Sequence, residues 1–183
     1  AAAAGGRPVT LGCFNNVAKG SDATRRGGAG ARAAGPGSRL LLKDRSLTRP
    51  AQQARVRARF ASLGLEGERI ELLGRTPGLG AHLAQYARMD IALDTFPYHG
   101  TTTTCEALGR GRSLVTRAGD RHAGRVGASL LAAAGHPEWV ARDWTDYARI
   151  AAELAADLPR LAKISAALRG DLGGSPLLDH AGQ

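Results

Sequence analysis

Four consecutive threonines, Thr101, Thr102, Thr103 and Thr104, follow Gly100, and Glu106 comes two residues later. Hydroxyls and free backbone N–H groups at the N-terminus of a helix can bind an anion such as phosphate. A carboxylate about one turn into the same helix can accept hydrogen bonds from the two hydroxyls of a ribose. Taken singly, each threonine is a good helix cap, and Glu favours the first turn of a helix. Four threonines in a row after a glycine favour a phosphate site.

A second set of polar residues follows the first apolar run, in the order Phe14-Asn15-Asn16 and then Lys19. A lysine at this point can reach the same edge of a parallel sheet and neutralise a diphosphate, although a solvated loop lysine explains Lys19 equally well. His82 is the third candidate. It begins a predicted helix, and a neutral imidazole can donate to phosphate or stack on a base. Taken alone, it would be assigned to the surface.

Short apolar runs alternate with helical patterns, which predicts an α/β fold with a Rossmann-like, doubly wound parallel sheet. The predicted strands are 9–14, 39–43, 70–73, 89–93, 113–116 and 139–141. Predicted helices cover 51–63, 79–87, 102–108 and 126–134, followed by one with an apolar face from Tyr147 to Leu154 and one that Pro159 begins. Each candidate group above follows a predicted strand. Because the carboxyl ends of parallel strands meet at one edge, the groups are expected to lie together.

The segment between the first two predicted strands is the least regular. It contains several glycines, each about 1 kcal/mol less favourable than alanine inside a helix, so we predict only a short or frayed helix there: Gly27, Gly28, Gly30, Gly35 and Gly37. We divide the chain into a tail over 1–8, a Rossmann-like lobe over 9–172 and a second tail over 173–183.

Length and composition limit the classes of protein that remain. The chain has 183 residues, enough for one domain with a core. No stretch has the roughly 20 apolar residues that cross a bilayer, and Cys13 and Cys105 alone form neither a disulfide framework nor a four-ligand zinc site. We therefore expect a cytoplasmic protein with reduced thiols and no metal.

The net charge of +9 leaves a nucleic-acid-binding module open as an alternative. Only three of the 25 basic residues are lysines, and aromatic residues make up 4% without interleaving with the arginines. A platform for stacking bases is therefore not visible. Arginines that form one continuous stripe would support nucleic-acid binding, and arginines scattered over the surface would count against it.

Other residues of reactive type have structural explanations. Trp139, Trp144 and Tyr147 are expected to complete the core. Cys105 is expected to be a buried small residue or a thiol at a helix start, and His136 and His180 to be surface residues. His122 lies in a loop before a helix at the predicted ligand edge, so both a contact with a ligand and a purely structural role stay open for it.

Several spaced blocks in one order resemble the C-terminal catalytic lobe of O-GlcNAc transferases, the SPINDLY/OGT-like group, and the bacterial members are the most similar. The resemblance runs from about Val9 to Leu178. The blocks are Phe14-Asn15-Asn16 with Lys19, residues 73–77 with His82, residues 90–94, residues 100–108, and residues 119–122 with Arg125, Val126, Ala128 and Ser129. The chain departs from the family pattern at three places. His99 stands before the glycine where the family has asparagine, and Gln85 stands where animal members carry a basic residue. Segment 109–113 also differs.

The resemblance implies a two-lobed GT-B fold, in which two Rossmann-like domains hold a sugar nucleotide between them. The implied enzyme moves N-acetylglucosamine from UDP-GlcNAc to serine or threonine of proteins and releases UDP, without a further cofactor. The partners of this lobe are then the UDP-sugar donor, a protein acceptor, the N-terminal lobe and the helical TPR repeats, and no membrane. A lobe that only docks a partner, without catalysis, is the other alternative.

The resemblance also assigns roles to the candidate residues. Lys19 matches the lysine on the diphosphate and is the catalytic candidate, because a cation there offsets the charge that builds on the leaving phosphate. Asn16 contributes an amide beside it. Thr76 falls in the loop whose backbone reads uracil, and His82 matches the histidine that packs by the nucleotide. The four-threonine turn supplies the remaining contacts: Thr102 and Thr103 with the phosphates, Glu106 with the ribose, and Thr101 beside them.

Overall fold

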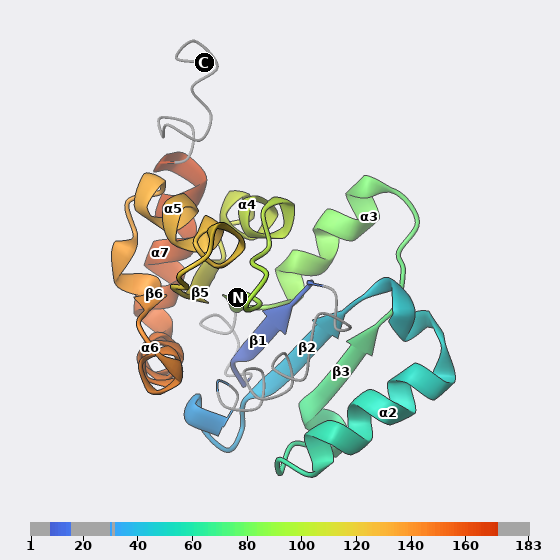
Figure 1. Cartoon of the computed structure of the whole chain (residues 1–183). Coiled ribbons are helices and arrows are strands. Elements are labelled where there is room, and N and C mark those ends of the chain that lie inside the picture. The colour runs from blue at the N-terminus through green and yellow to red at the C-terminus, as the bar shows by residue number, and fades with distance from the viewer. Residues whose placement is uncertain (1–7, 16–29, 31, 172–183) are drawn as a thin grey trace.

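A computed structural model describes residues 8–15, 30 and 32–171 (Figure 1). Its six strands form one sheet in the order β3-β2-β1-β4-β5-β6, and every neighbouring pair is parallel. The strands are β1 (Thr10–Cys13), β2 (Arg39–Lys43), β3 (Ile70–Leu73), β4 (Ile91–Leu93), β5 (Ser113–Arg117) and β6 (Val140–Ala141). The predicted doubly wound parallel sheet is therefore confirmed.

The helices follow the strands in alternation. They are α2 (Pro50–Ala61), α3 (Leu79–Ala84), α4 (Thr102–Gly109), α5 (Val126–Ala133), α6 (Trp144–Ala156) and α7 (Leu158–Asp171). Short 3-10 turns η3 (Arg45–Thr48), η4 (Gly67–Arg69), η5 (Gln85–Arg88), η6 (His122–Gly124) and η7 (Pro137–Trp139) join them. The predicted helix over 79–87 is thus α-helical only as far as Ala84 and continues as a 3-10 turn.

The apolar runs form strands that are covered on both faces. Leu11, Leu40, Ile91 and Val115 are completely buried, and each sits on a different strand. Parallel strands read as continuous apolar runs because helices cover both faces of the sheet. This is why the second strand matches the prediction to the residue; the third also matches, although it is an edge strand on which Glu71 is exposed. The first and fourth strands were predicted too long: the structure ends the first at Cys13 and begins the fourth at Ile91.

Local signals set the helix boundaries. Pro50 occupies the first turn of α2, where its missing N–H costs nothing. Val56 and Phe60, four residues apart, form the buried face of that helix. At α6, the Asp143 carboxylate accepts a hydrogen bond of 2.8 Å from the Asp146 backbone N–H and so caps the helix.

The aromatic residues expected in the core lie there, but Cys105 does not. Trp139 and Tyr147 are buried, and Trp144 is half-buried against the same core. The alternative of a buried Cys105 is wrong, because its residue is exposed on α4. His136 stacks on Trp139 with 3.8 Å between ring centroids, so it is only partly a surface residue.

The helix predicted between the first two strands lies mostly outside the described residues, as do His180 and nearly all of the two predicted tails. Its described end is helical at Gly30, Arg32 and Ala33, and the Ala34 N–H donates to the Gly30 carbonyl at 2.9 Å. Across the described part of the chain, no helix combines the length and the apolar character that crossing a membrane requires.

Candidate functional site

The carboxyl ends of the strands bring most of the predicted groups to one edge of the sheet. The strand order reverses between β1 and β4, and ligands of doubly wound folds bind at such a switch point. Asn15 follows β1, Lys43 ends β2, Thr76 follows β3, and the four-threonine turn follows β4. The helices α3 and α4 both begin at this edge and carry His82 and Glu106.

Four side chains form a cluster at this edge, called here the His82 cluster: Lys43, His82, Tyr86 and Glu106. His82 Nε2 lies 3.0 Å from Glu106 Oε2, and Tyr86 donates its hydroxyl to the same oxygen at 2.7 Å. On the other side of the imidazole, His82 Nδ1 lies 2.8 Å from Lys43 Nζ. The prediction that His82 and Glu106 lie together is confirmed, although they come from different helices.

The His82 cluster is largely withdrawn from water. Burial lowers the pKa of Lys43, and the nearby carboxylates of Glu106 and Asp44 oppose that shift. Burial, followed by the Glu106 carboxylate, raises the pKa of Tyr86, so this phenol stays protonated and donates. The Phe14 ring covers the cluster, with its centroid 4.6 Å from that of Tyr86 and 5.8 Å from Lys43 Nζ.

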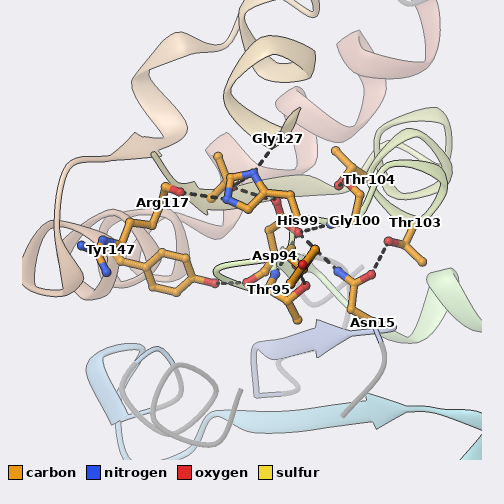
Figure 2. Close-up of polar contacts among 12 residues, drawn as sticks. Asn15, Asp94, Thr95, His99, Gly100, Thr103, Thr104, Arg117, Gly127 and Tyr147 are labelled. Atoms are coloured by element: carbon orange, nitrogen blue, oxygen red, sulfur yellow. Dashed lines mark hydrogen bonds and ion pairs between the residues drawn. The ribbon is translucent and has the colours of Figure 1, made fainter. Parts of the chain in front are cut away.

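The turn between β4 and α4 is held by a buried carboxylate, Asp94 (Figure 2). Its Oδ1 accepts hydrogen bonds from the backbone N–H of Thr95 and of Gly100, both at 2.8 Å, and from the Asn15 amide at 3.3 Å. Its Oδ2 accepts from the Thr116 hydroxyl at 2.8 Å. Burial raises the pKa of Asp94, and these donors stabilise its charged form.

His99 completes this network, and its role is structural. Nδ1 accepts a hydrogen bond of 2.8 Å from the Gly127 N–H, so Nε2 carries the hydrogen that is donated to the Arg117 carbonyl at 2.9 Å. Its side chain has no exposed surface. Gly127 is required at the start of α5, because a Cβ there would lie 2.6 Å from Thr116 Oγ1 and 2.9 Å from His99 Nδ1.

The four threonines divide into two pairs. Thr103 donates to Asn15 Oδ1 at 2.7 Å, and Thr104 donates to the Gly100 carbonyl at 2.7 Å. Thr101 and Thr102 are exposed. Thr101 occupies the N-cap position of α4 but makes no capping hydrogen bond through its side chain, so capping does not explain it. The start of α4 therefore faces outward without a side-chain cap.

Other predicted site residues are placed less completely. Asn16 and Lys19 lie outside the described residues. Thr76 lies after β3, and its Oγ1 is buried without a hydrogen-bond partner among the described residues. His122 is exposed in η6 at the same end of the sheet, after β5.

Sequence reasoning missed two members of the His82 cluster. Lys43 is the last residue of an apolar strand pattern. Its position at the carboxyl end of that strand was the signal that could have placed it at the ligand edge. Tyr86 lies in the predicted helix over 79–87, where the sequence indicates a buried ring but not the contact of its hydroxyl with Glu106. Within the described residues, no group of three or more His, Cys, Asp or Glu side chains is placed to hold a metal ion.

Comparison with known proteins identifies the family. The model of glycosyl transferase family 41 matches residues 46–181. The chain belongs to glycosyl transferase family 41. The matched residues include α3, α4 and the turn that Asp94 holds, whereas Asn15 and Lys43 of the candidate site precede the match.

Relatives of this family 41 chain agree. It is 40% identical over 169 residues to an Arabidopsis thaliana protein named as the probable UDP-N-acetylglucosamine--peptide N-acetylglucosaminyltransferase SPINDLY, covering 92% of this chain and 18% of that protein. It matches a solved mutant of the Thermobaculum terrenum O-GlcNAc transferase with a TM-score of 0.85 and 38% identity, over 92% of this chain and 32% of that one. The chain thus spans about a fifth of the length of the curated relatives it matches.

A more distant structure shows the fold alone. The C-terminal domain of a group 1 glycosyl transferase, LpcC from Francisella tularensis, matches with a TM-score of 0.65 at 14% identity. The match covers 92% of this chain and 87% of that domain. The family 41 chain therefore has the fold of the C-terminal Rossmann-like lobe of GT-B glycosyltransferases.

Proposed function

We propose that this chain is the donor-binding lobe of a glycosyltransferase that moves N-acetylglucosamine from UDP-GlcNAc to serine or threonine of proteins. The observation that carries the proposal is the joint position of Glu106 and the uncapped start of α4 at the switch point of a family 41 fold. The name of the Arabidopsis thaliana relative, which states this donor and a peptide acceptor, supports the same activity.

The ribose would be bound by the free oxygen of Glu106. Tyr86 and His82 both contact Oε2, and no described residue donates to Oε1. A carboxylate that is fixed through one oxygen presents the other at a defined angle, which suits two neighbouring hydroxyls. The fixed geometry lowers the entropy that a ligand must lose on binding.

The diphosphate would lie at the start of α4. Thr101 and Thr102 are exposed there, and the helix dipole favours an anion. As the glycosidic bond breaks, negative charge grows on the leaving UDP, and Lys19 would offset it together with the α4 backbone N–H groups. Removing one such group from a site that is organised in advance costs about 3–4 kcal/mol of transition-state stabilisation.

Other parts of the proposal concern what surrounds the lobe. A protein acceptor, an N-terminal lobe and TPR repeats would complete the enzyme, in the cytoplasm. Nucleic acid is a weaker candidate partner. Helix α2, which carries Arg55, Arg57 and Arg59, lies beside β3, whereas α6, which carries Arg149, lies beside β6 at the other end of the sheet (Figure 1), so these arginines do not form one stripe.

Isothermal titration of the folded chain with UDP tests the proposal. We expect binding in the micromolar range, lost in Lys19→Ala and in Glu106→Ala, and unchanged in Lys163→Ala, which alters an exposed lysine of α7. UMP should bind more weakly than UDP, because it lacks one phosphate. A folded chain that does not bind UDP, or that binds it equally well in Glu106→Ala, would overturn the assignment.

A further inference from the structure

Lys43 is a buried lysine that the proposed donor contacts do not use. It ends β2, and the residue is only 8% exposed. A lysine in such a place needs a partner for its charge. Its Nζ lies 2.8 Å from His82 Nδ1, while the Phe14 ring lies beneath it.

The direction of this hydrogen bond follows from the neighbours of the imidazole. An ammonium group only donates, so a bond to it requires a lone pair on Nδ1. The hydrogen of a neutral imidazole then sits on Nε2, where it points at the Glu106 carboxylate 3.0 Å away. In the other tautomer, with the hydrogen on Nδ1, Nε2 would be an acceptor facing the Glu106 carboxylate, which is also an acceptor, so no hydrogen bond could form there.

We infer that Lys43 is a positioning residue: it holds His82 as the neutral Nε2–H tautomer, and His82 in turn holds Glu106 in place for the ribose. The second step rests on the proposed function, whereas the first is a property of the free chain. Because both ring nitrogens are occupied, His82 can offer a nucleotide only the face of its ring. This decides between the two roles foreseen for it, in favour of packing over donation to phosphate.

The other charged groups around His82 agree with this arrangement. Glu106 faces it from α4, Tyr86 from η5 with a centroid separation of 5.7 Å, and Lys43 from β2, with Asp44 next along the chain. Both carboxylates favour the charged form of Lys43. The protonated phenol of Tyr86 gives Glu106 Oε2 a second donor. Among the described residues, Lys43 is the one that hydrogen-bonds His82 Nδ1.

Nitrogen NMR of the histidine rings in the free, labelled chain tests the first step. The His82 signals are identified by their loss in His82→Ala. In the native chain at neutral pH we expect Nδ1 to show the shift of an unprotonated nitrogen and Nε2 that of a protonated one. In Lys43→Met, Nδ1 loses its donor, and its signal should move toward that of a protonated nitrogen. Lys163→Met, the same change at an exposed lysine, should leave both signals in place.

UDP titration tests the second step. We expect Lys43→Met to weaken UDP binding about tenfold, a coupling typical of residues in contact. In a His82→Ala background the same change should have little further effect, because Lys43 would act through a side chain that is gone. A purely structural lysine would instead weaken binding equally in both backgrounds.

Each result is decisive. A native chain with a protonated His82 Nδ1 overturns the inference by itself, even if Lys43→Met does not fold. An equal loss of UDP affinity in both backgrounds overturns the second step. If UDP does not bind at all while the native His82 signals are as expected, the proposed function fails and the positioning of His82 by Lys43 stands.

Discussion

Replacing Tyr86 with phenylalanine isolates one contact of the His82 cluster. The tyrosine is 1% exposed, and its hydroxyl donates to Glu106 Oε2 at 2.7 Å. Tyr86→Phe removes that donor and keeps the ring, which packs on Phe14 with 4.6 Å between centroids. The core therefore loses one oxygen atom and gains no cavity large enough to matter.

The size of the effect follows from the charge of the acceptor. A hydrogen bond to a charged group contributes about 1.5–3 kcal/mol, because its loss leaves the carboxylate without a donor that water does not replace. We therefore expect Tyr86→Phe to lower the free energy of unfolding by about 2 kcal/mol. For a chain of this length, that corresponds to a fall in melting temperature of about 4–8 °C. UDP affinity should fall as well, because Glu106 is then held by His82 alone.

Urea denaturation and calorimetry of the native chain and two variants measure this effect. Tyr98→Phe is the matched control, since it removes the same atom from a side chain at the same edge of the sheet that is 58% exposed. Its stability should change less than that of Tyr86→Phe, because the removed hydroxyl belongs to a largely exposed side chain. If both variants unfold at the same denaturant concentration as the native chain, the hydrogen bond to Glu106 does not stabilise the fold and the reasoning is refuted.

Two further predictions concern the network that supports the site and the ion pairs of the buried Asp146 at the start of α6. Gly127→Ala should lower the free energy of unfolding by about 1–3 kcal/mol, because the added Cβ overpacks the site. Gly109→Ala is the control: nothing lies within 4 Å of its added Cβ, and alanine favours a helix over glycine, so the free energy of unfolding should rise by up to about 1 kcal/mol. Thermal melts measure both, and equal effects would contradict the packing argument. Arg149 and Arg142 lower the pKa of Asp146 to about 2. A carboxyl group whose pKa is lower in the folded chain than in the unfolded chain stabilises the fold at pH values above its unfolded pKa. This stabilisation is lost as the pH falls through its folded pKa. In denaturant titrations, the stability advantage of the native chain over Asp146→Asn should therefore be full above about pH 4 and vanish toward pH 2. An advantage that persists unchanged at pH 2 would exclude these ion pairs as its cause.

The sheet and its edge could be predicted because they depend on patterns within short segments. The run ending at Lys43 is apolar on both faces, which only a covered parallel strand explains, and its bounds were predicted correctly. Once the strands are parallel, the groups that follow them must share an edge. The meeting of His82 and Glu106 needed no more information than that.

Side-chain partners could not be predicted in the same way. The contact between Lys43 and His82 joins residues 39 apart and depends on how α3 lies over the end of β2. A lysine at the end of a strand reads as solvated, and its burial is a property of the assembled lobe. His99 differs from the family pattern, yet hydrogen bonds with the Arg117 carbonyl and the Gly127 N–H satisfy both of its ring nitrogens and make it a buried structural residue.

The Asp94 network has a consequence for how the site can be dissected. It joins Asn15 to Asp94 across 79 residues and to Thr103 across 88 residues, and it also takes in Gly127 of α5. Such distant contacts form only when most of the chain is in place. Fragments cut before α5 would therefore lose the Gly127 contact that holds His99 beside the threonine turn, even if they kept every residue predicted to touch the donor, so the proposed nucleotide binding is best tested on the whole lobe.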